Sequence, residues 1–338
     1  MARLGILVGV FAIAVLLTGL VRQYALRGFL MDIPNARSSH TIATPRGGGL
    51  GIVGAFLLAL SAGYWWEWVE LNTYLGFVIP GVLIAAIGFL DDHGGVPVRW
   101  RLLGHFIAAM CITYWIGGLD VIFISGYSIN LGVVGVLVSM LFVVWMLNLY
   151  NFMDGIDALA GVEAVTVCGA GAFISWFFAS ADSYIALSLS IAAAGFLLWN
   201  TPPARIFMGD IGSAFVGAML AALVLKTAVD TPSLLWSWLI LPGVFIVDAT
   251  WTLLVRFATG QAVSEGHRSH AYQLAARRFS SHGKISIAVG VINLVWLFPI
   301  ALWAAAAPQT ALLAVIIAYT PLWAVAFYLG AGARERTV

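Results

Sequence analysis

The sequence carries very little charge. Of its 338 residues, 9% are Asp, Glu, Lys or Arg, whereas 62% are apolar. This composition excludes a soluble globular protein, because too few polar side chains are present to cover a particle of that size. The two cysteines, Cys111 and Cys168, both lie inside apolar runs. They indicate neither a disulfide framework nor a zinc site. A net charge of +1 gives no indication of partners, and we expect no nucleic-acid partner.

What the sequence has in abundance is long apolar runs. A helix needs about 20 predominantly apolar residues to cross the hydrocarbon core of a bilayer. We therefore predict an all-α, polytopic integral membrane bundle of about 11 transmembrane helices, with residues 1–338 forming a single transmembrane domain. The candidate segments are 4–21, 49–66, 74–90, 102–118, 130–149, 161–179, 184–199, 212–229, 235–255, 285–304 and 310–329.

The basic residues predict the orientation of this bundle. All but two of the 16 Lys and Arg residues fall in alternate loops, the exceptions being Arg3 and Lys226. Cytoplasmic loops hold the excess of such residues, so the N-terminus is expected outside and the C-terminus in the cytoplasm. Five cytoplasmic loops then carry the candidate chemistry, at residues 22–49, 91–101, 150–160, 200–212 and 256–284.

Two of these loops carry clustered oxygen ligands. Asp91 and Asp92 are adjacent at the end of an apolar run, where their repulsion calls for a cation or a proton. Asn151, Asp154 and Asp157 recur at a spacing of three, which would place them along one face of a helical turn. Such oxygen clusters suit a hard divalent ion such as Mg²⁺. The alternatives are a solvated helix end for the pair and a capped turn for the triplet.

A third loop contains the run Gly209-Asp210-Ile211-Gly212-Ser213 directly before an apolar segment. Glycines allow a phosphate to approach the backbone, and a helix start offers free amide hydrogens. Asp210 is therefore a candidate metal ligand and Ser213 a candidate cap or phosphate contact. Taken alone, the run also fits an ordinary turn.

Histidine and arginine occur together in two further loops. His267, Arg268 and His270 could hold a phosphate oxygen or transfer a proton, or they could be ordinary interfacial residues. His40 and Arg46 precede a run of glycines, which fits either a binding loop or a flexible basic linker.

Asp248 differs from these residues because it lies deep within an apolar segment. It is either a functional group or a buried hydrogen-bonding partner between helices.

Together, the loops supply carboxylates for a metal, helix starts for phosphate and a cationic rim, a combination suited to phosphoryl transfer. An ion-coupled transporter would more naturally place its ionisable groups near the middle of the membrane, where Asp248 is the candidate. A scaffold protein would need none of these carboxylates for activity.

The chain resembles the polyprenyl-phosphate N-acetylhexosamine-1-phosphate transferases of the glycosyltransferase family 4 type. That family contains the translocase I enzymes and the initiators of enterobacterial common antigen and O-antigen. The resemblance rests on four motifs in the family's order, together with the stretch from His40 to Gly49. The motifs are Asp91-Asp92, Asn151-x-x-Asp154-Gly155-x-Asp157, Gly209-Asp210-x-Gly212-Ser213 and His267-Arg268-Ser269-His270.

The resemblance implies a bacterial cytoplasmic (inner) membrane enzyme that uses Mg²⁺, or alternatively Mn²⁺, with its active site on the cytoplasmic face. A phosphate oxygen of polyprenyl (undecaprenyl) phosphate would attack the sugar-linked phosphorus of a UDP-N-acetylhexosamine and release UMP. Family precedent also allows a homodimer.

The resemblance assigns roles to individual residues as well. Asp210 is the implied metal ligand, with Asp92 supporting the metal or phosphate, and Asp91 the base. Asp154 and Asp157 join Asn151 in a catalytic and nucleotide-side cluster. The other implied substrate contacts are His40, Arg46, Ser213, His267, Arg268 and His270.

One departure from the family bears on the substrate. Translocase I enzymes carry consecutive histidines, whereas Arg268 and Ser269 interrupt them here. This form resembles the O-antigen initiators, which accept UDP-GlcNAc or 6-deoxy relatives such as UDP-FucNAc and UDP-QuiNAc. The implied pathway is O-antigen, and hence lipopolysaccharide, or other cell-envelope polysaccharide synthesis. Transfer from UDP-MurNAc-pentapeptide is the alternative.

Overall fold

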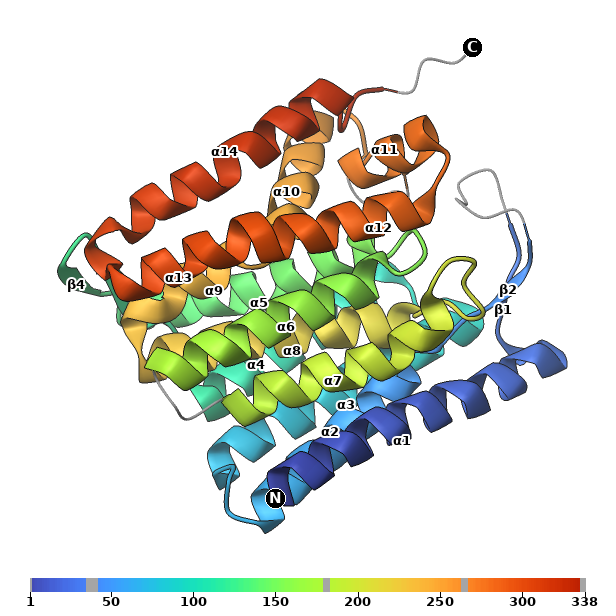
Figure 1. The fold of residues 1–338 in the computed structure, drawn as a ribbon, viewed down its shortest axis with the longest axis horizontal. Helices are drawn as coiled ribbons and strands as arrows, with labels where there is room; N and C mark the ends of the chain where they lie inside the picture. Colours follow the sequence, from blue (N-terminus) through green and yellow to red (C-terminus); the bar gives the residue numbers. More distant parts are fainter. Residues whose placement is uncertain (1, 35–41, 179–182, 263–266, 335–338) are drawn as a thin grey trace.

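A computed structural model describes residues 2–34, 42–178, 183–262 and 267–334 as a bundle of helices with two short β-hairpins (Figure 1). The α-helices are α1 (Ala2–Tyr24), α2 (Leu50–Trp65), α3 (Leu71–Gly94), α4 (Val98–Ile116), α5 (Val133–Met153), α6 (Leu159–Phe178), α7 (Ser183–Asn200), α8 (Asp210–Asp230), α9 (Leu235–Ile240), α10 (Gly243–Ala258), α11 (Ala271–Phe279), α12 (His282–Val291), α13 (Phe298–Ala306) and α14 (Ala311–Leu329).

Shorter elements join or extend these helices. The π-helical turns η1 (Ala25–Phe29) and η3 (Ile292–Leu297) continue α1 and link α12 to α13, and the 3₁₀ turns are η2 (Pro232–Leu234) and η4 (Pro308–Thr310). Strand β1 (Met31–Asp32) pairs antiparallel with β2 (Thr44–Pro45), and β3 (Val121–Ile124) pairs antiparallel with β4 (Tyr127–Asn130).

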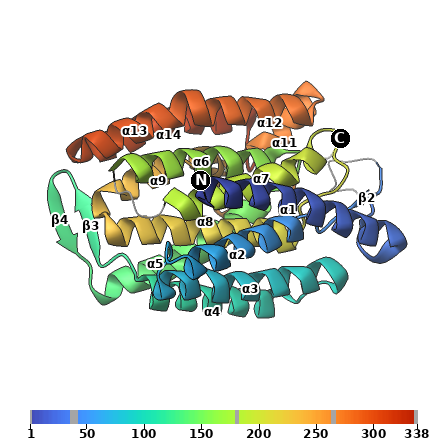
Figure 2. The same ribbon diagram turned by 60° about the horizontal axis from the view of Figure 1, so that its bottom comes forward.

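Helix α8 forms the centre of the bundle. Every residue from Ile211 to Leu225 is buried, and α3 and α5 are among the helices packed against it. The view in Figure 2 shows α8 between α2, α3 and α4 on one side and α6 and α7 on the other. This central position fixes the start of α8, at Asp210, relative to the surrounding helices.

All eleven predicted segments are helical, but the predicted count of eleven spans is not confirmed. In the described residues, eight helices are long and apolar enough to cross a membrane, and nine if a bent pair counts as one span. That pair, Pro232–Ile240 and Gly243–Ala258, is bent by 72°, and Pro242 lies at the break, where it cannot donate a helical hydrogen bond. Helix α2 has only 16 residues, and α4 carries Arg99, Arg101 and His105 in its first turns.

The candidate motifs gather at one end of the bundle. In Figure 1 this end holds α11 and the β1–β2 hairpin, and it lies opposite the β3–β4 hairpin. The protein is therefore a multi-pass membrane protein with its polar motifs at one end, as expected. The assignment of that end to the cytoplasm stays a prediction.

Candidate functional site

The start of α8 is capped by a carboxylate from another helix. Gly209 adopts a φ of 76°, and the following amides of Asp210 and Ile211 donate to Asp92 Oδ1 and Oδ2 at 3.1 and 3.2 Å. Asp92, at the end of α3, is only 4% exposed. The sequence predicts free amides at this helix start for a phosphate, and this prediction is wrong for these two amides. A carboxylate favours the positive end of the helix for the same reason that a phosphate would.

The glycines around this helix start allow backbones to pack closely. A methyl group on Gly49 would lie 2.2 Å from Gly212 Cα, and one on Gly88 would lie 2.6 Å from the Asp210 carbonyl oxygen. The first turns of α2 and α8 and the last turns of α3 therefore need glycine at these contacts. This close packing gives Gly49 and Gly212 a structural role in addition to the predicted one.

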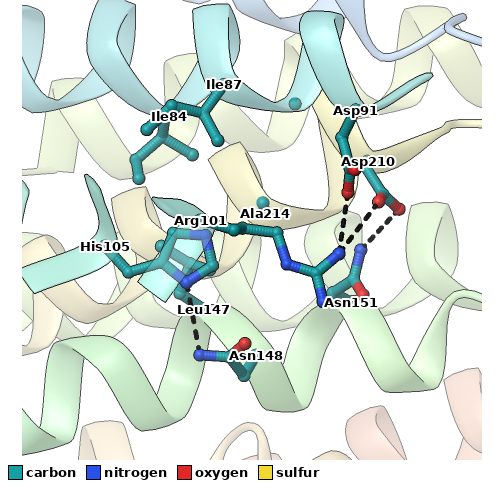
Figure 3. A pocket seen from close by; sticks show the side chains of 11 residues that line it. Ile84, Ile87, Asp91, Arg101, His105, Leu147, Asn148, Asn151, Asp210 and Ala214 are labelled. Atoms are coloured by element: carbon teal, nitrogen blue, oxygen red, sulfur yellow. Dashed lines mark hydrogen bonds and ion pairs between the residues drawn. The ribbon is translucent and has the colours of Figure 1, made fainter. Parts of the chain in front are cut away.

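Four polar side chains from four helices converge beside this cap. Arg101 Nη1 on α4 lies 2.7 Å from Asp91 Oδ2 and 3.8 Å from Asp210 Oδ2. Asn151 Nδ2, in the last turn of α5, donates to Asp210 Oδ1 at 2.8 Å and to Ser213 Oγ at 2.9 Å. Figure 3 shows the guanidinium group of Arg101 and the amide of Asn151 beside each other, both facing the neighbouring carboxylates of Asp91 and Asp210. We call Asp91, Arg101, Asn151 and Asp210 the acidic centre.

A cavity runs from the acidic centre into the bundle. Besides these four residues, its lining includes His105 on α4 and Asn148 on α5 (Figure 3). The Asn148 Nδ2 atom lies 3.4 Å from His105 Nδ1 and donates to the Val144 carbonyl at 2.7 Å. The polar surface of the site therefore extends one helical turn below Arg101.

The predicted helical face bearing Asn151, Asp154 and Asp157 does not form. Helix α5 ends at Met153, Asp154 has non-helical φ and ψ of −88° and 55°, and Ala158 has a positive φ of 66°. Gly155 and the positive φ of Ala158 place a turn here, so the helical period ends before the second aspartate. Asn151 therefore faces Asp210, whereas Asp157 turns toward α12.

The carboxyl group of Asp154 interacts electrostatically with the acidic centre and with Asp157. Burial raises the pKa of its carboxyl well above the ordinary value of 3.8, and the negative charges of Asp210, Asp92 and Asp157 raise it further. The predicted carboxylates are thus close enough to influence one another, although they do not form one set of metal ligands.

Asp157 borders a polar cleft of about 650 Å³. Its Oδ2 accepts from the Ala204 amide at 3.1 Å, and its Oδ1 lies 3.3 Å from His282 Nδ1 at the start of α12. The cleft is also lined by Pro202, Pro203, Arg268, Gln273, Ala276, Arg277, Ser280, Ser281 and Gly283. Arg268 therefore lies where its predicted contact with a substrate is sterically feasible.

The two predicted histidines have different surroundings. His270 is 2% exposed, and its Nδ1 lies 3.2 Å from Asp248 Oδ1. His267 is partly exposed and stacks on His270, with ring centres 4.9 Å apart. Burial lowers the pKa of His267 to about 4, and its electrostatic interactions with the neighbouring His270 and Arg256 side chains lower it further. Substrate binding by either histidine stays a prediction, and His267 is the more accessible of the two.

The first predicted loop is described only in part. His40 lies outside the described residues. Arg46 follows β2, where its Nη2 donates to the Asp92 carbonyl oxygen and its Nε lies 3.8 Å from Asp92 Oδ1. A groove of about 270 Å³ runs from this region along α1, and its lining is apolar apart from Tyr24 and Asp92.

The described residues contain no group of three or more His, Cys, Asp or Glu side chains that could hold a metal ion. The pair formed by Asp91 and Asp210 nevertheless fits Mg²⁺ chemistry, because this ion is often held by one or two carboxylates together with waters and substrate phosphates. Asp92 is less suited, since both of its oxygens already accept backbone hydrogen bonds.

Two contributors to the site, Arg101 and His282, are not among the site residues predicted from the sequence. The spacing of Arg101, within the polar patch that begins at Asp91, offered a weak signal. His282 gave none, because its partner Asp157 lies 125 positions away in the sequence.

The fold and the site define a polytopic helical membrane protein with a carboxylate and arginine centre at one end. Comparison with known proteins shows which family it resembles. Residues 74–228 match the model of "Glycosyl transferase family 4", and this stretch contains Asp91, Asn151 and Asp210. The central part of the chain is therefore similar to members of this family, which confirms the resemblance seen in its motifs.

Curated relatives cover most of the chain. A "Probable undecaprenyl-phosphate N-acetylglucosaminyl 1-phosphate transferase" of Bacillus subtilis is 28% identical, over 83% of this chain and 79% of the relative. A "Decaprenyl-phosphate N-acetylglucosaminephosphotransferase" of Mycolicibacterium smegmatis is 29% identical, over 81% and 76%. A "Phospho-N-acetylmuramoyl-pentapeptide-transferase" of Streptococcus pneumoniae is 28% identical, over 62% and 66%.

Proposed function

We propose that this protein transfers an N-acetylhexosamine 1-phosphate from a UDP-sugar to polyprenyl phosphate in the bacterial cytoplasmic membrane and releases UMP. A lipid phosphate oxygen forms a bond to the sugar-linked phosphorus, and the bond from that phosphorus to the UMP oxygen breaks. The anomeric bond of the sugar is not involved. The observation that carries this proposal is the convergence of Asp91, Arg101, Asn151 and Asp210 from four helices.

The acidic centre has the parts that phosphoryl transfer needs. Such reactions depend mainly on positioning and on neutralising charge that is spread over phosphate oxygens. Asp91 and Asp210 would hold Mg²⁺, which would neutralise part of the diphosphate charge when bound. Arg101 can donate to a phosphate oxygen from the same centre, because its guanidinium group offers five donors. We propose for Asp91, which pairs with Arg101 at 2.7 Å, the role that the resemblance implies, that of the base which would accept the proton of the lipid phosphate.

Two cavities of different character lie near the acidic centre, one lined by Asp157 and the other by Asp92. The cleft beside Asp157 is polar and open, and its volume is in the range of small-molecule sites, which supports entry of the nucleotide sugar from water. The groove along α1 is largely apolar and ends at Asp92, which supports approach of a polyprenyl chain from the membrane. Reaction between substrates from two phases requires such an arrangement.

The sugar is proposed to be GlcNAc or a 6-deoxy relative, such as FucNAc or QuiNAc, in O-antigen or related envelope polysaccharide synthesis. The interrupted histidine motif and the two N-acetylglucosamine-phosphate transferases among the relatives support this choice. Transfer of phospho-MurNAc-pentapeptide is a second candidate, favoured by the relative from Streptococcus pneumoniae. The transporter alternative depended on Asp248, whose four hydrogen bonds are explained by the fold.

A donor panel tests the proposal. Purified protein is incubated with polyprenyl phosphate, Mg²⁺ and in turn UDP-GlcNAc, UDP-FucNAc, UDP-QuiNAc or UDP-MurNAc-pentapeptide, and UMP is measured. We expect UMP from at least one donor, and only when lipid phosphate and Mg²⁺ are both present. Absence of UMP with every donor would overturn the proposal.

Helix α8 provides a matched pair of variants for this assay, because Asp210 begins it and Asp230 ends it. Asp210→Asn should abolish UMP release, since it removes a charge from the acidic centre. Asp230→Asn removes the same charge from the other end of the helix, where Asp230 pairs with Lys226. We expect this control to keep wild-type activity. Equal loss in both variants would contradict the assignment of the acidic centre.

A further inference from the structure

Asp248 on α10 caps a helix that lies elsewhere in the chain. Its Oδ1 accepts from the Ala271 amide at 2.9 Å and its Oδ2 from the Tyr272 amide at 2.9 Å. These are the first two residues of α11. Thr252 Oγ1, one turn along α10, also donates to Oδ1 at 3.1 Å. With 5% exposure, Asp248 has no surface available for a substrate, and its carboxylate is filled by donors from the protein.

The same carboxylate fixes the ring of His270. A carboxylate only accepts hydrogen bonds, so the proton lies on His270 Nδ1, which is 3.2 Å from Asp248 Oδ1. The ring of Phe152 stacks on the ring of His270, with centres 6.3 Å apart. Phe152 belongs to the last turn of α5, two residues before Asp154. The ring of His270 thus contacts the segment that carries the catalytic candidates.

Helix α11 touches this segment at two further points. The Tyr272 hydroxyl donates to the Phe152 carbonyl oxygen at 3.0 Å. A methyl group on Gly155 would lie 2.2 Å from that hydroxyl oxygen, so Gly155 allows the close contact. Asp248, α11 and residues 151–157 therefore form one continuous chain of contacts from the membrane-embedded helix to the acidic centre.

We infer that Asp248 is a positioning residue: its carboxylate holds α11, through His270 and Tyr272, against residues 151–157 and so sets the positions of Asn151 and Asp154. This inference deepens the proposed function and rests on it for its catalytic consequence. In this inference His270 has a structural role in the histidine motif, and His267 and Arg268 are the residues that face the substrate. The inference also explains an ionisable group within an apolar helix without ion transport.

The test compares two variants of the full-length protein in detergent or nanodiscs. Asp248→Asn keeps the size of the side chain but leaves one oxygen for three donors from residues 270–272. We expect kcat to fall about 10- to 100-fold, as for other partners that orient a site residue, with KM for the UDP-sugar within about 3-fold. Thr252→Val is the control, because it removes the hydrogen bond from Thr252 to Asp248, which lies within α10, and leaves the bonds from Asp248 to α11 in place. This control should keep kcat within about 3-fold of wild type.

Hydrogen exchange provides a readout that does not depend on activity. Peptides covering residues 150–158 and 270–279 should exchange faster in Asp248→Asn, because α11 is no longer held against the loop. Tyr272→Phe removes the hydroxyl that contacts Phe152 and Gly155 but leaves the Asp248 carboxylate in place, and it serves if Asp248→Asn does not fold. We expect it to speed exchange at residues 150–158 and to lower kcat. Combined with Asp248→Asn it should add little, because both act through one path.

Several results would overturn the inference. These are a raised KM with unchanged kcat in Asp248→Asn, unchanged exchange at residues 150–158 in both variants, or equal damage from Thr252→Val. If the wild type transfers no sugar phosphate from any donor, the proposed function fails. The exchange measurement still decides whether Asp248 positions the loop.

Discussion

Replacement of Asp154 by asparagine should stabilise the protein while it inactivates the enzyme. The change keeps the size of the side chain and removes a carboxyl whose pKa is raised well above 3.8 by burial and by Asp210, Asp92 and Asp157. The folded protein therefore holds the Asp154 proton more tightly than the unfolded chain does. The wild type loses stability as pH rises from the ordinary value toward the raised one, and the full loss is present at higher pH. Asp154→Asn has no carboxyl at this position, so its stability does not fall with rising pH for this reason.

The magnitude follows from the same shift. Each unit by which folding raises the pKa of Asp154 corresponds to about 1.4 kcal/mol of unfolding free energy. Each kcal/mol gained by Asp154→Asn at pH 7 should raise its melting temperature above that of the wild type by about 2–4 °C. UMP release should fall by at least about 100-fold, as expected for loss of an electrostatic group in the active site.

The assay is thermal unfolding of both proteins in the same detergent, from pH 4 to pH 8. The two curves should converge at pH 4, where Asp154 is protonated, and separate as pH rises. Asp120→Asn, at an exposed carboxyl before β3, is the control and should follow the wild type. A wild type that is equally or more stable than Asp154→Asn at pH 7 would refute the reasoning.

Three further predictions concern charge and metal. Arg101→Gln leaves Asp91 and Asp210 without the cation that they share. The free energy of unfolding, measured by denaturation, should fall by about 2 kcal/mol, and UMP release in the donor assay should fall by about 100-fold. Unchanged values in both assays would contradict the bridging role of Arg101. The pKa of His267 is about 4 in the folded protein, against an ordinary value of 6.5. The wild type should therefore lose stability as pH falls from 6.5 to 4, and His267→Gln should lose less. Parallel curves of stability against pH for the two proteins would refute this. Removal of divalent ions with a chelator should stop UMP release, and Mg²⁺ should restore it, whereas activity that survives chelation would contradict a metal-dependent reaction.

The helices could be predicted from the sequence because their signal is strong. Long apolar runs marked every one of the eleven segments that proved helical, including α2 and α4. What the sequence could not give was which of them qualify as full spans. The bend at Pro242 and the short length of α2 depend on local geometry and helix ends, where apolar patterns carry little information.

The site was predicted in its composition rather than in its geometry. The aspartates of the loops, Asp91, Asp157 and Asp210 among them, were expected to converge in one pocket. Asp91 and Asp210 line the same cavity together with Asn151, whereas Asp157 lines a separate cleft. The helix caps formed by Asp92 and Asp248 could not be predicted. Each joins residues that are more than 20 positions apart in the sequence and meet only in the folded protein. The turn at Gly155 broke the expected helical face because a spacing of three indicates a shared face only while the helix continues.

The central claim is that the reaction transfers a sugar phosphate and not the sugar alone. The most direct measurement uses a UDP-N-acetylhexosamine radiolabelled at the β-phosphorus, incubated with the protein, polyprenyl phosphate and Mg²⁺ and then partitioned between water and organic solvent. The proposed reaction places the label in the lipid fraction and leaves unlabelled UMP in water. Label that stays in water as UDP, with the sugar alone on the lipid, would contradict it.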